Sequence, residues 1–235
     1  HGFKTITPIP LAESASWNLN LIKKSATMAA KEAASAGINW TFAPMVDISR
    51  DARWGRVMEG AGEDPYLGSK IAVARIEGFQ GKDLNDPLTI ASCAKHFAAY
   101  GFAESGRDYN TVDMGNQTLH NIVLPPFKAS VGANVATFMN SFNELNGIPA
   151  TGSTFLQRDI LKGDWNYKGV MVSDWGSIGE MIPHGYSKDL KSAAKSAILA
   201  GSDMDMMSSA YIKHLKTLLD EKEINISIID DAVQR

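Results

Sequence analysis

The chain has 235 residues, of which 44% are hydrophobic and 21% charged, a balance typical of a globular protein with one sizeable core. The net charge is −3, and the chain has no block of like charge, which argues against nucleic-acid or membrane-surface binding. It has no run of 18 apolar residues, so no membrane-spanning helix is predicted. Cys93 is the one cysteine, which excludes a disulfide framework and a cysteine-based metal site. Its apolar neighbours predict a small core residue.

Segments with helical and strand-like patterns alternate along the first half of the chain. A helix is expected over 16–37, where small and apolar residues recur at spacings of three and four. A strand over 38–46 and a polar loop over 47–62 follow. Asp64, directly before Pro65, predicts the cap of the next helix. A strand over 88–93, a polar loop over 103–114 and a helix over 117–129 complete this half.

The same alternation continues in the second half. We expect strands over 135–139, 169–172 and 204–206, and helices over 154–161, 190–200 and 212–219. Short turns lie on one side of this repeat and long polar loops on the other. The pattern predicts a parallel sheet covered by helices.

Polar side chains follow four of the apolar runs where each run ends. Asp47 follows the first predicted strand, Lys95 and His96 the second, residues 140–144 the third and Asp174 the fourth. In (β/α) barrels the loops at this end of the strands converge on one mouth, where active sites are built. An open doubly wound sheet would gather ligands at one switch point instead. Because no Gly-rich phosphate loop follows any strand, we expect an α/β fold of the (β/α)₈ barrel type.

Each of these residues also has a purely structural interpretation. Asp174 on its own could cap the following helix. The pair Lys95-His96 could be a core histidine beside a buried ion pair. The arginine-rich loop over 47–62 could be solvated, although Trp54 within it indicates an ordered loop.

Two further acids flank Met204 on the last predicted strand. Asp203 and Asp205 would face the same way, as a pair of metal ligands does. Since no histidine or third carboxylate lies near them in the sequence, we expect no metal site.

Five longer stretches surround these polar residues. They are APMVDISRDARWGRVMEGAGEDPYLGS at 43–69, KHFAAYG at 95–101, YNTVDM at 109–114, FNELNGIPAT at 142–151 and GVMVSDWGSI at 169–178. Together they resemble glycoside hydrolase family 3, and within it the bacterial periplasmic β-glucosidase branch. The resemblance extends over nearly the whole chain. It implies the family's N-terminal catalytic barrel domain, without a metal or an organic cofactor.

The resemblance also implies a retaining, exo-acting β-glycosidase whose nucleophile is Asp174. In such enzymes one carboxyl group attacks the anomeric carbon, and a second, about 5–5.5 Å away, protonates the leaving oxygen. By the same resemblance, the residues that bind the sugar are Arg56, Lys95 and His96, with Trp175 flanking the ring and Tyr109 as a further candidate. Charged donors hold hydroxyls more strongly than neutral ones, and cations near Asp174 would keep it ionised.

The implied substrates are β-linked glucosides or oligosaccharides that lose a terminal β-D-glucosyl residue, with β-xylosides as the alternative. Relatives with N-acetylglucosaminidase activity carry Lys-His-Phe-Pro-Gly-His-Gly in the second stretch, whereas this chain has Ala98-Ala99-Tyr100. Plant and fungal members often have tyrosine in place of Phe142, so a hydroxyl near the nucleophile is missing here. The branch implies a periplasmic or secreted protein. Whether the protein forms a homodimer is left open by the sequence.

The second carboxyl group is often a glutamate of a C-terminal domain, which we expect to be absent from this chain. The aspartate with which the family grips the sugar lies just before the His1-Gly2 pair at which the chain starts. With about five of eight barrel strands counted, residues 1–235 are expected to be a partial barrel domain, cut at both ends and with open edges. Glu180, on the first turns of the helix after Asp174, is the candidate within the chain for an acid or substrate-binding role.

Two interpretations that assign the chain to other functional classes remain open. A Schiff-base aldolase barrel would use Lys95 as its nucleophile. An inactive fragment, or a sugar-binding remnant without catalysis, would also fit a partial domain.

Overall fold

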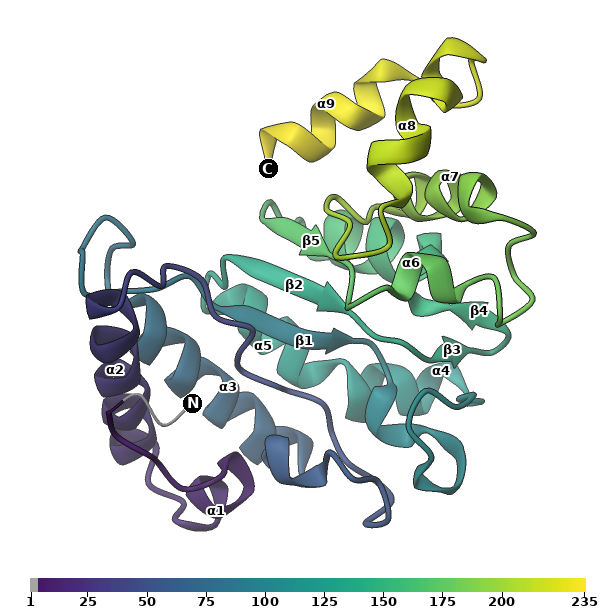
Figure 1. Ribbon diagram of the computed structural model, residues 1–235. Helices are drawn as coiled ribbons and strands as arrows, with labels where there is room; N and C mark the ends of the chain where they lie inside the picture. The colour runs from purple at the N-terminus through teal and green to yellow at the C-terminus, as the bar shows by residue number, and fades with distance from the viewer. Residues whose placement is uncertain (1–3) are drawn as a thin grey trace.

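Parallel strands form the centre of the computed structural model, which describes residues 4–235. The hydrogen-bonded strands are β1 (Cys93–Phe97), β2 (Thr137–Asn140) and β5 (Val170–Val172), in the order β1-β2-β5. Single parallel bridges add one segment at each edge: Trp40 with Ala91 and Met45 with Lys95 beside β1, and Met204 with Val172 beside β5. Within the described residues, five parallel segments thus lie side by side in chain order and the sheet is open (Figure 1).

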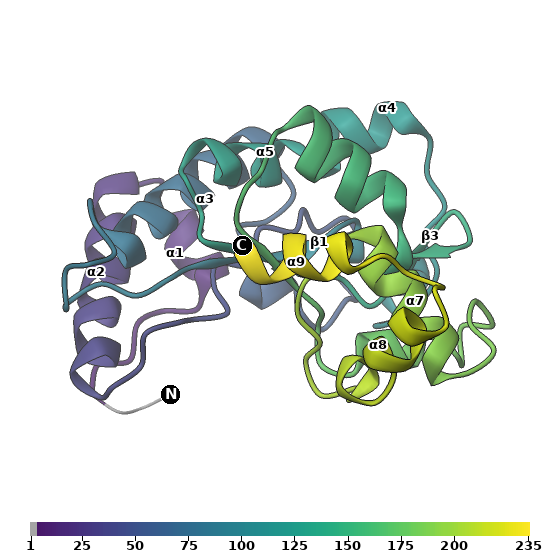
Figure 2. The same ribbon diagram turned by 90° about the horizontal axis from the view of Figure 1, so that it is seen from above.

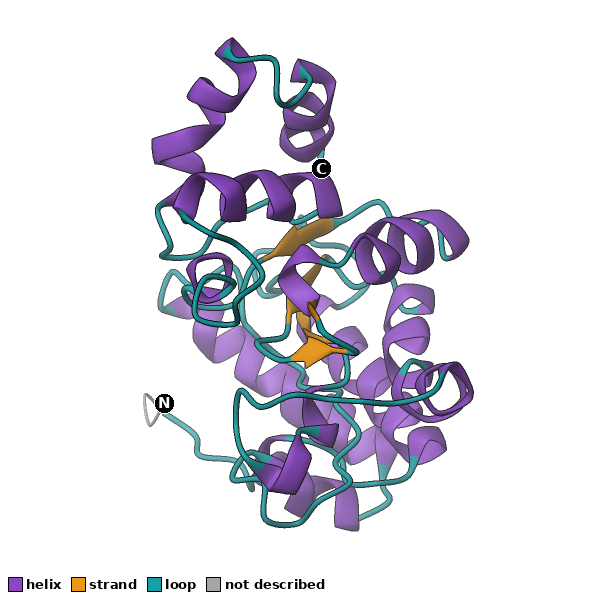
Figure 3. Ribbon diagram, turned by 90° about the vertical axis from the view of Figure 1, so that its right-hand side faces the viewer, coloured by secondary structure: helices purple, strands orange, loops and turns teal. Residues whose placement is uncertain are grey.

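Among residues 4–235, three α-helices precede β1, and the others lie between and after the later strands. They are α1 (Pro10–Ala15), α2 (Leu19–Ser35), α3 (Pro65–Gln80), α4 (Asn116–Thr118), α5 (Pro125–Gly132), α6 (Ser177–Glu180), α7 (Leu190–Ala200), α8 (Ala210–Asp220) and α9 (Ile226–Gln234), with π-helical turns at Leu119–Val123 and Phe155–Asp164. A small antiparallel hairpin, β3 (Glu144–Leu145) and β4 (Ile148–Pro149), follows β2. Seen from above, α2, α3 and α5 follow one another along the outside of the sheet (Figure 2). The strands lie in the middle of the molecule with helices around them (Figure 3).

The first two long helices begin at side-chain caps. The Asn18 side-chain oxygen accepts the N–H of Leu21 at 3.0 Å at the start of α2, and Asp64 accepts the N–H of Leu67 at 2.7 Å at the start of α3. Each cap satisfies a backbone donor that the first turn leaves free. The predicted cap at Asp64 is therefore confirmed.

Aromatic side chains fill the core between the sheet and the outer helices. Phe97 of β1 lies with its ring 5.2 Å from that of Phe127 on α5 and 5.8 Å from that of Phe138 on β2. All three rings are fully buried, and burial of large aromatic side chains dominates core energetics. Cys93 is also fully buried, as its apolar neighbours predicted.

Two predicted strands differ from the structure. Residues 38–46 do lie beside β1, with Val46 donating its N–H to the Lys95 carbonyl at 2.7 Å, but they form isolated bridges and no regular strand. Pro44 within the segment has no N–H to donate, which interrupts a regular ladder. The strand predicted over 88–93 begins only at Cys93, so Lys95 and His96 lie inside β1 and not beyond its end.

The remaining elements shift or shorten. The helix predicted over 117–129 is divided into α4, a π-helical turn and α5, because Pro125 cannot donate to a preceding turn and starts a new helix. The helix predicted over 154–161 is the π-helical segment 155–164. The strand predicted over 204–206 is reduced to the one bridge at Met204.

Within the described residues, no helix has the length and apolar character needed to cross a bilayer.

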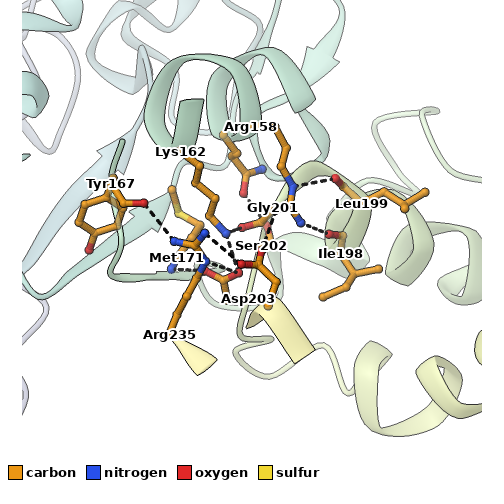
Figure 4. Close-up of polar contacts among 12 residues, drawn as sticks. Arg158, Lys162, Tyr167, Met171, Ile198, Leu199, Gly201, Ser202, Asp203 and Arg235 are labelled. Carbon is orange, nitrogen blue, oxygen red and sulfur yellow. Dashed lines mark hydrogen bonds and ion pairs between the residues drawn. The ribbon is translucent and has the colours of Figure 1, made fainter. Parts of the chain in front are cut away.

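Asp203 and Asp205 do not form a pair; Figure 4 shows Asp203 among its own partners. The Asp203 side chain is buried and forms an ion pair with Lys162 at 2.6 Å, while its other oxygen accepts the N–H of Met171 at 2.8 Å. Asp205 accepts backbone N–H groups at the start of α8, including that of Ala210 at 2.6 Å. Because each carboxylate is satisfied by its own donors, both have structural roles.

Candidate active site

Asp174 lies directly after β5, on the turn that leads into α6. Its Oδ1 atom accepts the N–H of Trp175 at 2.7 Å, and its Oδ2 atom lies 3.5 Å from Nε2 of His96. The side chain is 11% exposed, so one edge of the carboxylate reaches solvent. Gly176, with a left-handed backbone, is the N-cap of α6, and no side chain caps that helix. The interpretation of Asp174 as a helix cap is therefore wrong.

His96 and Asp47 form a buried pair beside Asp174. Asp47 Oδ2 lies 2.8 Å from Nδ1 of His96 and accepts the backbone N–H of the same residue at 2.8 Å. Burial, with the positive charges of Arg56 and Lys95, lowers the pKa of His96 well below its usual range, so the imidazole is neutral. Burial raises the pKa of Asp47 to about 7, although the His96 N–H and the same two cations lower it.

Two cations lie near this pair. The Arg56 guanidinium binds both carboxylate oxygens of Glu59, at 2.7 and 2.9 Å, which fixes the orientation of its planar group. Lys95 is half-buried and forms no ion pair with any residue from 4 to 235. An ammonium group without a carboxylate partner can donate hydrogen bonds to a ligand.

Aromatic rings form one wall of the site. The Tyr100 ring lies edge-on to His96 at 5.2 Å and to Trp54 at 5.1 Å between centroids. Phe142 and Tyr109 continue the wall, with their rings 4.5 Å apart. Trp54 is buried and donates its indole N–H to Asp108 at 2.7 Å, so the ordered loop expected around it is confirmed. Trp54, Tyr100 and Phe142 are buried, so Tyr109 is the exposed ring of this wall.

Three further predicted residues lie at the open side of this site. Trp175 is 62% exposed and Tyr109 is 46% exposed. Burial and the negative charge of Asp174 raise the pKa of Glu180. The pKa of Tyr109 is also raised, by burial first and then by the charges of Glu180, Asp108 and Asp174, so these groups lie within electrostatic range of one another.

Sequence reasoning missed the groups that hold the predicted residues in place. Asp47 stood out at a strand end but received no role, although His96 lies against it. Glu59 follows Arg56 by three residues, a spacing that indicates an ion pair and could have been used. Nothing in the sequence distinguished Tyr100 from other buried aromatics. Among the described residues, no three His, Cys, Asp or Glu side chains are grouped as a metal site requires.

The arrangement suits a reaction on a polyhydroxylated ring. It combines a carboxylate at the tip of a strand, a neutral imidazole, an unpaired ammonium, an oriented guanidinium and an aromatic wall. Comparison with known proteins gives the class. The profile of the Glycosyl hydrolase family 3 N terminal domain matches residues 1–235. The chain therefore belongs to glycoside hydrolase family 3, as its sequence motifs predicted.

Individual relatives agree with this assignment. The chain is 43% identical over 234 residues to a periplasmic β-glucosidase of Salmonella typhimurium, covering 100% of this chain and 31% of that protein. It is 34% identical over 247 residues to a β-xylosidase of Formosa agariphila, covering 100% of this chain and 34% of that protein. The crystal structure of a β-glucosidase from Listeria innocua in complex with glucose superposes with a TM-score of 0.98 at 44% identity, covering 100% of this chain and 33% of that one. The chain thus spans about a third of the length of these relatives.

Proposed function

We propose that this chain carries the nucleophile of a retaining, exo-acting β-glucosidase, and that the nucleophile is Asp174. The observation that carries the proposal is the position of its carboxylate at the carboxyl end of β5, in contact with His96 and partly open to solvent. Asp174 would attack the anomeric carbon as the bond to the leaving oxygen breaks and that oxygen takes a proton. Water would then attack the same carbon, release Asp174 and return a proton to the acid.

The neighbouring residues support substrate binding in this proposal. Lys95, His96 and Arg56 would hold hydroxyls of the terminal sugar, and Tyr109 and Trp175 would contact its apolar faces or the next sugar. Glu180 is proposed as the acid, because a raised pKa keeps a carboxyl group protonated until the leaving oxygen needs the proton. The five parallel segments would form part of a (β/α)₈ barrel. The periplasmic relative supports a periplasmic or secreted location.

The test uses the full-length protein as its gene encodes it. Asp174→Ala should lower kcat on an aryl β-glucoside by about 10⁴-fold or more, because no other group can form the glycosyl intermediate. A 2-deoxy-2-fluoro-glucoside with a good leaving group should add its sugar to the peptide that contains Asp174, as seen by mass spectrometry. Retained turnover in Asp174→Ala, or labelling elsewhere, would contradict the proposal.

A second candidate substrate is a β-xyloside, which the similarity to the Formosa agariphila β-xylosidase favours. The two sugars differ by one hydroxymethyl group, so the ratio of kcat/KM for the matched aryl glycosides decides between them. If the 235-residue chain by itself is inactive while the full-length protein turns over, the chain is an inactive fragment of an active enzyme.

A further inference from the structure

We propose that Asp47 is a positioning residue that acts through His96: its carboxylate holds the imidazole with the proton on Nδ1, so that Nε2 offers a lone pair to a substrate hydroxyl beside Asp174. The part of the inference that concerns the substrate hydroxyl rests on the proposed glycosidase function. The part that concerns the protonation of the imidazole does not. Asp47 would contact neither the substrate nor the reacting atoms.

Two donors of one residue converge on one oxygen. Asp47 Oδ2 lies 2.8 Å from the backbone nitrogen of His96 and 2.8 Å from its Nδ1. Asp47 is carried by the edge segment beside β1, where Val46 donates its N–H to the Lys95 carbonyl at 2.7 Å. Backbone pairing therefore sets the distance between the carboxylate and the imidazole, and both side chains are almost completely buried, at 1% and 0% exposure.

This geometry selects one tautomer. A neutral imidazole has one N–H donor and one lone pair, and the hydrogen bond made by one nitrogen decides the state of the other. A carboxylate oxygen that already accepts a backbone N–H is best placed to accept a second donor, which assigns the proton to Nδ1. The other oxygen, Oδ1, is buried without a hydrogen-bond partner, so a proton on Oδ1 would have no acceptor.

The free nitrogen faces the candidate reaction site. His96 Nε2 is buried without a hydrogen-bond partner and lies 3.5 Å from Oδ2 of Asp174. In the proposed tautomer both atoms are acceptors, so a donor is missing between them. A substrate O–H group can supply that donor, whereas an ether or a fluorine cannot.

The first experiment measures the tautomer without any activity assay. The full-length protein, labelled with ¹⁵N at histidine, is studied by NMR at about pH 8, where Asp47 is ionised because its pKa is about 7. The groups that face the imidazole are Asp47, Asp174, Glu59, Arg56 and Lys95. We expect a protonated Nδ1 and an unprotonated Nε2, with the signal assigned by its loss in His96→Gln. A proton on Nε2 would overturn the proposal even if the protein is an active glucosidase.

The second experiment separates positioning from a general structural role. Asp47→Ala and His96→Ala should each lower kcat/KM by about 10- to 100-fold, and the double variant should be no worse than His96→Ala, because Asp47 acts through that side chain. Asp47→Asn should lose less than Asp47→Ala, since its amide oxygen can still accept both His96 donors. Additive losses in the double variant would contradict the proposal.

Deoxy analogues of an aryl β-glucoside sharpen the same test. Removing one hydroxyl at a time, at C3, C4 or C6, should reveal one position whose loss no longer matters in His96→Ala, and the same position should be the insensitive one in Asp47→Ala. Asp51→Asn is the matched control, because that acid lies in the same loop and pairs with the exposed Arg53. It should leave the ratio of kcat/KM between each deoxy analogue and the parent glucoside unchanged. An equal loss on all analogues in Asp47→Ala would indicate a structural role only and would contradict the proposal.

Discussion

At the scale of single residues, burial acts on the titratable groups of the candidate site in one direction, toward their neutral forms. It raises the pKa of Asp47 and of Glu180, and it lowers the pKa of His96. Arg56 remains charged, because its ion pair with Glu59 outweighs burial and raises its pKa. The site therefore contains a neutral imidazole and two carboxyl groups whose pKa is raised, groups suited to hydroxyl recognition and to proton transfer.

Glu180 gives a prediction that depends on the leaving group. If Glu180 is the acid, Glu180→Gln in the full-length protein should lower kcat/KM for an alkyl β-glucoside by about 100-fold or more, and hardly affect a dinitrophenyl glucoside, which leaves without a proton. Because its pKa is raised, the wild-type rate should fall as the pH rises through that pKa, and this alkaline limb should disappear in the variant. Glu77→Gln, at an exposed ion pair with Lys23, is the control. Equal losses on both substrates would contradict an acid role.

The residues that the pattern of the chain singled out were those that follow apolar runs, because position along a strand is a local signal, whereas Arg56, Trp175 and Tyr109 came from the family resemblance. Asp174 and the pair at 95–96 stood out in this way, and the structure brings Asp174 and His96 within 3.5 Å. The contact between Asp47 and His96 joins residues 49 apart, and no local pattern encodes which of several buried acids lies against an imidazole. The state of the imidazole could therefore not be predicted.

At the scale of elements, the close approach of α2 and α3 depends on a residue without a side chain. A Cβ atom at Gly78 of α3 would lie 2.5 Å from the Cβ of Ala26 and 2.6 Å from the carbonyl oxygen of Lys23, both on α2. Neither atom can move without shifting a helix. Gly78 is therefore required by packing and not by backbone conformation.

Gly78→Ala should destabilise the protein by about 1–3 kcal/mol, because overpacking forces the two helices apart. Gly132→Ala is the matched control: it lies at the end of α5 with nothing within 4 Å of its Cβ position, so alanine should be neutral or stabilising by up to about 1 kcal/mol. Urea denaturation of the two variants measures both values. Equal midpoints would show that α2 and α3 can separate at little cost.

Helices were predicted best where both ends carry a local signal. The helix expected over 190–200 is α7, Leu190–Ala200, because Asp189 forms a capping box with Ser192 and Gly201 ends the helix with a left-handed backbone. The strand expected over 88–93 was misplaced, because Lys95 and His96 suggested a loop. Inside β1 the buried His96 is held by Asp47 from the edge segment, and a contact between residues so far apart in the sequence is tertiary information.

At the scale of the whole molecule, the parallel sheet covered by helices was predictable because each strand–helix unit is a local pattern. Closure of a sheet depends on how many strands pair edge to edge, which no local pattern encodes. The described segments form an open sheet, and polar contacts help to join its last edge to the surrounding helices. Asp203, beside β5, meets Lys162 from the preceding helical segment, and Arg235 after α9 donates to the Tyr167 carbonyl at 3.0 Å (Figure 4).

The Lys162–Asp203 ion pair should therefore control the stability of the whole fold. Their side chains are 5% and 2% exposed, and Lys162 also donates to the Gly201 carbonyl at 2.7 Å. Lys162→Met leaves a buried carboxylate without its cation and should lower the free energy of unfolding by about 3–5 kcal/mol. Lys216→Met, which breaks the exposed pair with Asp220, should cost less than about 1 kcal/mol. Urea denaturation at neutral pH measures both, and similar losses would show that Asp203 finds another partner, such as Arg235, when Lys162 is removed.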